Sequence, residues 1–192
     1  MIRKHFQYRT TIATILAEDQ KQIDAASDAM VAARHEVERC IAADPYFGST
    51  FESYVPECDF FAVQRMVAAA GKAGVGPMAA VAGTIAWAGA EAMQAAGAAF
   101  GVVDNGGDIA LFADREVRVG VHAGTSRFSN RIAFLVPPQE RVLGICTSSA
   151  TVGHSISLGT ADAVTVFSPD VALADALATA LCNTIGDCSE EA

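Results

Sequence analysis

Two oxygen-bearing side chains lie within an otherwise apolar segment near the C-terminal end of the chain. Asp175 and Thr179 are the only residues of the run 173–181 that are neither alanine nor leucine. A helix that is apolar on nearly every side is typically buried, and residues four apart project from the same side of it. A buried carboxylate without a basic partner is unstable, and hard oxygens suit a cation such as Mg²⁺. The spacing therefore predicts a metal site; the alternative is a protonated or water-bridged Asp175 in the core.

A glycine-rich turn between two predicted strands is the second candidate site. It reads Asp104-Asn105-Gly106-Gly107-Asp108. Asn-Gly is the strongest short signal for a type I′ β-hairpin, so a plain hairpin is one interpretation. Glycines also let backbone amides approach a ligand closely, and an acid flanks this turn on each side. The two interpretations are compatible.

Hydroxyl side chains and a histidine follow a predicted buried strand in the segment 146–155. It contains Thr147, Ser148, Ser149 and His154. Small hydroxyl residues and glycine can bind phosphate through side-chain and backbone donors, and a histidine can act as a general base or contact a phosphate. An exposed Ser/Thr loop is the alternative. A serine hydrolase is disfavoured, because no Gly-x-Ser-x-Gly turn occurs.

These residues need an α+β scaffold to bring them together. Apolar periodicity predicts helices at 21–41, 60–73, 78–96 and 171–184, and strands at 6–16 (one strand or two), 100–103, 109–112, 117–122, 131–136, 142–147 and 163–167. Short connections favour antiparallel pairing, with the helices packed on the sheet faces. Ser168 is expected to cap the last helix, with Pro169 in its first turn. The loop 46–57 could cover a cleft or simply pack on the surface.

Length and charge limit the classes of protein that fit. The 192 residues suit one compact domain. Two fused halves are also compatible, about 1–97 being mainly helical after an N-terminal strand and about 98–192 mainly strands with a final helix. The formal net charge of −9 argues against a nucleic-acid groove. The Ala-rich helices could pack within a subunit or between subunits of an oligomer.

Cysteine usage and hydropathy indicate a reducing, aqueous environment. The five cysteines are odd in number and none forms a Cys-x-x-Cys pair, so a zinc or iron-sulfur site is not expected. Reduced thiols in a cytoplasmic protein are the simplest interpretation, and no apolar secretory segment is recognised. The apolar run 78–100 contains Glu91 and Gln94, so we expect a buried helix rather than a membrane span.

Several segments, in this order, resemble a known family. They read Val-Gly-Pro-Met-Ala-Ala-Val-Ala-Gly at 75–83, Asn-Gly-Gly-Asp at 105–108, Thr-Ser-Ser-Ala-Thr-Val-Gly-His-Ser at 147–155 and Ala-Asp-Ala-Leu-Ala-Thr-Ala at 174–180. Together they look like the ApbE superfamily, whose characterised members are FAD:protein FMN transferases. The closest resemblance is to its short prokaryotic branch of unassigned function.

The resemblance implies a fold and a set of site residues. The fold would be tandem antiparallel sheets with packed helices, similar to a T-fold duplication, around a cleft for FAD and Mg²⁺. Asp175 and Thr179 would be metal ligands, joined by a backbone carbonyl within 79–82. The flavin nucleotide would contact the turn and the strand end, and His154 matches a catalytic histidine. The residues expected at the nucleotide are Asn105, Gly106, Gly107, Asp108, Thr147, Ser148 and Ser149.

Two departures from the family pattern keep the function open. No Asp-Pro pair follows His154, and no lysine occurs in 78–83, where the transferases carry one. The first hypothesis is a Mg²⁺-dependent enzyme that transfers FMN to a protein acceptor or cleaves FAD. The second is a module that binds a flavin, another nucleotide or an anionic metabolite without turnover. A scaffold protein on an enzyme fold is the third.

Overall fold

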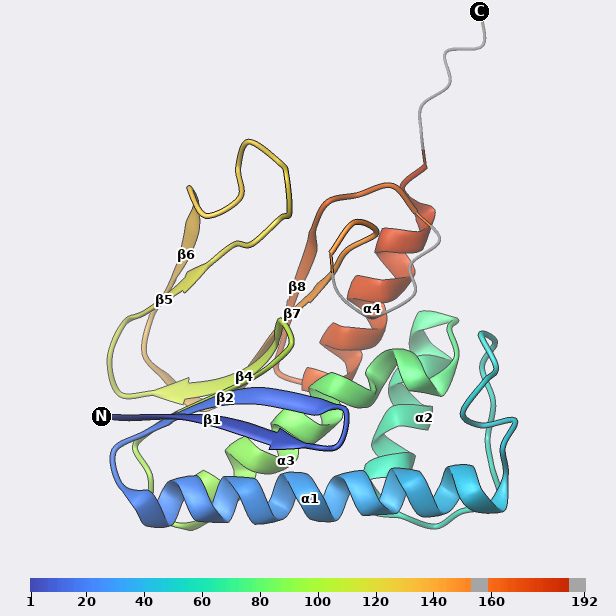
Figure 1. Ribbon diagram of the computed structural model, residues 1–192, viewed down its shortest axis with the longest axis horizontal. Coiled ribbons are helices and arrows are strands. Elements are labelled where there is room, and N and C mark those ends of the chain that lie inside the picture. Colours follow the sequence, from blue (N-terminus) through green and yellow to red (C-terminus); the bar gives the residue numbers. More distant parts are fainter. Residues whose placement is uncertain (153–158, 187–192) are drawn as a thin grey trace, which may run out of the picture.

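A six-stranded antiparallel sheet with the order β1-β2-β3-β4-β7-β8 runs through the molecule (Figure 1). The computed structural model describes residues 1–152 and 159–186. The strands are β1 (Ile2–Tyr8), β2 (Thr11–Ala17), β3 (Phe100–Asn105), β4 (Asp108–Ala113), β7 (Gln139–Ser148) and β8 (Val164–Ser168). A separate antiparallel pair, β5 (Val117–Gly120) and β6 (Ala133–Val136), projects from it as a hairpin.

The helices pack on one face of this sheet. They are α1 (Gln20–Ala43), α2 (Phe61–Ala73), α3 (Val81–Ala95) and α4 (Val171–Thr184), with the short 3₁₀-helix η1 (Pro77–Ala80) before α3. Helix α3 contacts β3 and β4, α4 contacts β7 and β8, and α1 lies along α3. Figure 1 shows α1 beneath the sheet and α3 between them. Helix α1 begins at a capping box formed by Asp19 and Gln22, and α2 ends at Gly74 in the left-handed conformation.

Strand alternation divides the sheet into two faces with separate cores. On the side that we call the helix face, Val103, Ala110 and Cys146 belong to the large core beneath α3 and α4. On the opposite side, the hairpin face, Val102 and Ile145 belong to a smaller core, which the β5–β6 hairpin covers. The alternation therefore decides which side chains near the strand ends meet helices and which meet the hairpin.

The predicted fold class is confirmed: the chain is α+β, with antiparallel sheets and helices packed on them. The sheet takes β1 and β2 from the first predicted half of the chain and its other strands from the second. The predicted segment 6–16 lies in two strands joined at residues 9–10, and the predicted helix 78–96 is divided between η1 and α3.

The start of α4 differs from the prediction. Its N-cap is Asp170, whose Oδ1 accepts a hydrogen bond from the Leu173 N–H at 3.0 Å. Ser168 lies at the end of β8, and its Oγ accepts from the Asp170 N–H at 3.1 Å. Asp170 caps the helix because its carboxylate accepts a hydrogen bond from the N–H three residues later. The Ser168 hydroxyl instead accepts from an N–H in the turn before the helix.

Across the described ranges 1–152 and 159–186, no single helix is long and apolar enough to cross a membrane. Taken together, helix α2 and the η1–α3 segment have the length and apolar composition of a membrane span. The two are, however, bent by 107° relative to each other at the break between them. The apolar run 78–100, for which a buried helix was predicted, contributes residues to the core, among them Ile85, Ala86 and Met93.

Candidate functional site

A cleft of about 1600 Å³ lies around the ends of β3, β4 and β7. Small-molecule sites commonly measure roughly 300–1,000 Å³, so this cleft has room for a dinucleotide. Many of its lining residues belong to the set predicted from the sequence: Asn105, Gly106, Gly107, Asp108, Thr147, Ser149 and Thr179. Ser148 and Asp175 are not among the lining residues. The structure thus brings the glycine turn, the hydroxyl strand end and α4 to one cavity.

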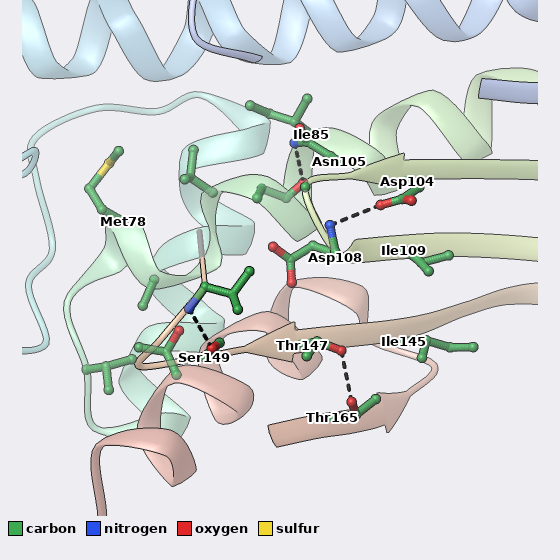
Figure 2. Close-up of a pocket in the computed structure, with 18 of the residues that line it drawn as sticks. Met78, Ile85, Asp104, Asn105, Asp108, Ile109, Ile145, Thr147, Ser149 and Thr165 are labelled. Atoms are coloured by element: carbon green, nitrogen blue, oxygen red, sulfur yellow. Dashed lines mark hydrogen bonds between the residues drawn. The ribbon is translucent and has the colours of Figure 1, made fainter. Parts of the chain in front are cut away.

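The glycine turn is a two-residue β-hairpin between β3 and β4. Asn105 pairs with Asp108, and the central residues Gly106 and Gly107 have φ values of 72° and 106°. Positive φ at both positions is the type I′ geometry, which glycine adopts without strain. The central pair is therefore Gly-Gly rather than the Asn-Gly that the sequence suggested. Asp104 supports the turn, because its Oδ1 accepts from the Gly107 N–H at 3.0 Å (Figure 2).

Asn105 connects the turn to the helical layer. It is 8% exposed, and its Nδ2 donates to the Ala82 carbonyl at 3.0 Å (Figure 2). By strand alternation, Asn105 and Asp108 share the helix face, whereas Asp104 and Ile109 share the hairpin face. Because the cleft passes around the turn between β3 and β4, residues from both faces of the sheet line it.

The hydroxyl residues at the end of β7 have three different environments. Thr147 lies on the hairpin face, and its Oγ1 is 2.9 Å from Oγ1 of Thr165, its partner on β8 (Figure 2). Ser149 Oγ accepts from the backbone N–H groups of Thr151 and Val152 at 3.1 and 2.9 Å. Ser148 lies on the helix face, and within the described part of the chain its buried Oγ has no hydrogen-bond partner. Thr147 and Ser149 are therefore the members available to a ligand in the cleft.

Asp175 lies on α4, behind the wall of the cleft. It is 7% exposed, and its Oδ2 accepts from the Gly83 N–H at 2.8 Å. Gly83 is in the first turn of α3, where N–H groups are free and the helix dipole is positive. Asp175 therefore stabilises the start of a neighbouring helix. Burial nonetheless raises its pKa well above the usual value, and the charge of Asp108 adds to the rise.

Asp108 and Cys146 form the adjoining part of this buried polar group. They face each other in the β4–β7 register. Burial raises the pKa of Asp108 to about 7, although hydrogen bonds with the Cys146 thiol and the Thr147 backbone oppose the rise. Burial also raises the pKa of Cys146 well above its ordinary value, together with the charges of Asp108 and Asp175. In the parts of the chain that the structure describes, neither of these aspartates forms an ion pair.

Apart from the Cys146 thiol, the side-chain donors of this group are hard oxygens. Asp108 and Asp175 supply carboxylates, and Thr179 supplies a hydroxyl one helical turn after Asp175. No group of three or more His, Cys, Asp or Glu side chains arranged for a metal ion occurs within 1–152 and 159–186. Protein Mg²⁺ sites commonly use one or two carboxylates and complete the shell with water and ligand phosphates. The residues present therefore fit Mg²⁺ held jointly with a phosphate ligand.

The cleft also contains residues that the sequence did not single out as ligands. Arg34 is the one Lys or Arg among its described lining residues; its Nε donates to Glu38 at 2.9 Å and its Nη1 to Thr11 at 3.1 Å. His5 and His122 line the cleft as well. Their only signal was residue type. The loop segment 48–51 forms another part of the wall, and His154 lies outside the described residues.

Comparisons with known proteins agree with this architecture. A family model described as AbpE bacteria matches residues 2–191. A UPF0280 protein of Methanoculleus marisnigri is 66% identical over 185 residues, covering 96% of this chain and 76% of the relative. One from Methanosphaerula palustris is 60% identical over 185 residues, covering 96% and 78%. The crystal structure of the Pseudomonas stutzeri flavinyl transferase ApbE, apo form, is similar in fold, with a TM-score of 0.61, 12% identity and coverage of 94% and 83%.

Proposed function

The chain belongs to the ApbE-like family described as AbpE bacteria, and from this membership we propose that its cleft binds a flavin nucleotide, FAD, together with Mg²⁺. The expected reaction is hydrolysis of FAD or transfer of its FMN part to a protein acceptor. The name of the structural relative, a flavinyl transferase, supports this direction. We place the reaction in the cytoplasm, as the odd number of cysteines suggests.

One observation carries the proposal. Two carboxylates, the half-buried Asp108 in the cleft wall and the buried Asp175 behind it, lie side by side without a basic partner among the described residues, and both have raised pKa values. Such a pair is unfavourable while both groups are ionised. A divalent cation would stabilise both in the charged form and would attract a diphosphate to this end of the cleft. The neighbouring turn and strand end supply the neutral donors that a nucleotide needs.

The residues of the chain have separable roles in this proposal. Gly106 and Gly107 leave space for a phosphate close to the backbone, since neither carries a Cβ. Thr147 and Ser149 orient phosphate or ribose oxygens through their hydroxyls. Asp108 can hold or release a proton near neutral pH, and His154 is the proposed general base. Bound Mg²⁺ would stabilise negative charge on the reacting diphosphate.

Turnover can be tested directly on the purified chain. Incubation with FAD and Mg²⁺ should release AMP, detected by liquid chromatography. FMN should appear free if FAD is hydrolysed, or covalently bound if an acceptor protein is added. Mg²⁺ removal by a chelator should abolish AMP formation. Neither product, with intact FAD binding, would contradict an enzymatic role.

The metal role predicts a difference in thermal stability between two variants. Mg²⁺ should raise the Tm of the wild type and leave that of Asp175→Asn unchanged, because the amide removes the charge that binds the ion. Asp24→Asn is the matched control: it removes one negative charge from an exposed position on α1 and should keep the wild-type response. Differential scanning fluorimetry with and without MgCl₂ measures the shift. Equal responses in all three proteins would contradict the ligand role.

Binding without turnover is the second candidate. It is favoured by the lack of lysine in 78–83, which leaves Arg34 as the one Lys or Arg among the described residues of the cleft. In this case FAD should raise the Tm, since a ligand stabilises the state that it binds. No AMP should form with or without Mg²⁺. Retention of a yellow chromophore through purification would favour this alternative over a scaffold role.

A further inference from the structure

The β5–β6 hairpin presents exposed arginines and exposed apolar side chains together. No Asp or Glu occurs between residues 117 and 139, although the chain as a whole has a formal net charge of −9. Arg118, Arg127 and Arg131 are exposed, and none of them forms an ion pair with another residue that the structure describes. Three large hydrophobic side chains on the same hairpin are 48–57% exposed: Phe128, Ile132 and Leu135. Arginine beside exposed apolar groups is typical of a surface that binds another protein.

The outer side of this hairpin is an ordered surface. Arg118 and Leu135 are partners in the β5–β6 register and lie on the outer side, whereas Val119 on the inner side packs against the smaller core. At the tip, the Ala123 N–H donates to Ser129 Oγ at 3.0 Å. A surface that is already ordered loses little conformational freedom when a partner binds.

The opposite charge is combined with exposed apolar groups in the segment that joins α1 to α2, residues 44–60, which we call the α1–α2 loop. No Lys or Arg occurs between residues 40 and 64. The next cation along the chain, Arg65, is paired with Glu91. The acids of the loop are Asp44, Glu52, Glu57 and Asp59. Large hydrophobic side chains that are 54–75% exposed accompany them, the last at the start of α2: Tyr46, Phe51, Val55 and Phe61.

The α1–α2 loop is also held in place by its own contacts. The Tyr54 hydroxyl donates to Asp44 at 2.7 Å, and the ring centroids of Tyr54 and Tyr46 lie 4.9 Å apart in an edge-on arrangement. A Cβ added to Gly76 would lie 2.0 Å from the Thr50 carbonyl oxygen, so the loop packs closely on the start of η1. Figure 1 shows the loop and the β5–β6 hairpin at opposite ends of the molecule. The two surfaces therefore do not meet within one chain.

We propose that the β5–β6 hairpin of one copy of this chain docks on the α1–α2 loop of a second copy. The contact would bury the apolar side chains of both surfaces and place arginines opposite carboxylates. An anionic membrane would also accept the hairpin, but it would leave the acidic, apolar loop without a partner. In a two-fold pair of chains the contact would occur twice. Residues 119–122 and 48–51 line the cleft, so the contact would lie beside the cleft of each copy.

The mass of the full chain in solution tests the proposal. Size-exclusion chromatography with light scattering is run at about 100 µM, above the micromolar Kd of the weaker interfaces of standard size. The wild type should have at least twice the 19.9 kDa mass of one chain. Two charge-reversal variants should each be monomeric, because like charges then face each other. The hairpin variant combines Arg127→Glu with Arg131→Glu, and the loop variant combines Glu52→Lys with Glu57→Lys.

Two matched controls separate this contact from an effect of net charge. Lys4→Glu with Lys21→Glu changes the net charge as the hairpin variant does, and Asp24→Lys with Asp28→Lys changes it as the loop variant does. All four residues are exposed and lie outside both surfaces. Both controls should keep the wild-type mass, and circular dichroism should show that every variant is folded. Controls that are also monomeric would overturn the proposal.

Mixing the hairpin variant with the loop variant tests whether these two surfaces meet each other. The altered hairpin then faces the altered loop, and the intact hairpin faces the intact loop, so opposite charges meet at both contacts. The mixture should regain the mass of the wild type. A monomeric wild type, a hairpin or loop variant that keeps the wild-type mass, or a mixture that stays monomeric would each overturn the proposal. A monomeric wild type that sediments with phosphatidylserine vesicles, while the hairpin variant does not, would assign the hairpin to an anionic lipid surface instead.

Discussion

At the residue scale, the main feature is a carboxylate with two roles. The Asp175 carboxylate accepts a hydrogen bond from the Gly83 N–H, one of the free N–H groups at the start of α3. Burial and the charge of Asp108 nevertheless raise the pKa of Asp175 well above its ordinary value. The bond to the first turn of α3 stabilises the charged form only in part. Asp108 lies in the same polar group, with its pKa raised to about 7. A cation would relieve both groups, and protonation is the alternative available to them without one.

The Asp108 pKa predicts how stability changes with pH in the absence of metal. A group with a folded pKa above its unfolded value destabilises the folded state as pH rises. The free energy of unfolding should therefore fall between pH 3.8, the ordinary pKa, and about 7. Asp108→Asn should reduce this slope, by up to about 1.4 kcal/mol per pH unit. Urea denaturation in a chelator, at several pH values, measures it.

The exposed Asp24→Asn serves as the control, because it lies on the solvent side of α1. It should keep the wild-type dependence on pH. If Asp108→Asn and wild type lose stability in parallel over this range, Asp108 does not carry the raised pKa.

At the element scale, the site depends on how closely α3 and α4 approach each other. A Cβ on Gly83 would lie 2.8 Å from the Asp175 Cβ and 2.9 Å from the Val171 carbonyl. Gly144 provides a similar opening under the start of α4, where a Cβ would lie 2.8 Å from Val171 Cα. These two glycines let α4 lie close to both α3 and β7. The position of Asp175 beside the cleft follows from that packing.

Gly83→Ala should therefore destabilise the chain by about 1–3 kcal/mol, since backbone atoms cannot move aside. Gly71→Ala on α2 is the matched control: apart from its chain neighbours and the backbone of its own helix, no atom lies within 4 Å of its added Cβ. In the control, alanine should be neutral or stabilising by about 0.5–1 kcal/mol, as is usual in a helix. Urea denaturation compares them. If the two variants were equally stable, the close approach of α3 and α4 would not be the reason that residue 83 is a glycine.

Arg65 joins α2 to α3 in a second element-scale contact. Its guanidinium donates to both Glu91 carboxylate oxygens at 2.8 and 2.7 Å, and its Cζ lies 3.9 Å from the Trp87 ring centroid and 4.3 Å from that of Phe61. Lysine can neither form the two-pronged bond nor stack as a plane. Arg65→Lys should therefore lower the free energy of unfolding by about 1–2 kcal/mol.

Arg115→Lys is the comparison for Arg65→Lys in the same denaturation measurement. The Arg115 side chain is 52% exposed and pairs with Glu18 and Asp114. Exposed pairs contribute little, so its effect should stay within about 0.5 kcal/mol. A lysine tolerated equally well at both positions would show that the planar contact is unimportant.

At the scale of the whole molecule, one sheet unites the two predicted halves. β2 pairs with β3 across the boundary near residue 97, and α3 from the first half packs on β3 and β4 from the second. Separate unfolding of the halves would break both interfaces. We therefore expect one cooperative unit, in which the cleft is formed only when the whole chain is folded.

Urea unfolding followed by two probes tests this expectation. Trp87 is the one tryptophan of the chain and reports on α3, in the first half. Far-ultraviolet circular dichroism reports on the helices and strands of both halves. The two transitions should share one midpoint, because the probes belong to one unit. Midpoints that differ beyond experimental error would indicate two units that unfold independently.

The sequence by itself determined the elements, because periodicity and capping act over a few residues. The alternation in 100–113 predicted two strands, and the apolar run 171–184 predicted α4 with its observed bounds. The sequence also selected residues that line the cleft, such as Gly107 and Thr147. The tertiary structure decided the rest. The identity of the donor to Asp175, the side of the sheet on which Ser148 lies and the approach of Arg34 to the cleft all depend on contacts between segments far apart in the chain. No local pattern encodes them, since they are set by the packing of whole elements against one another.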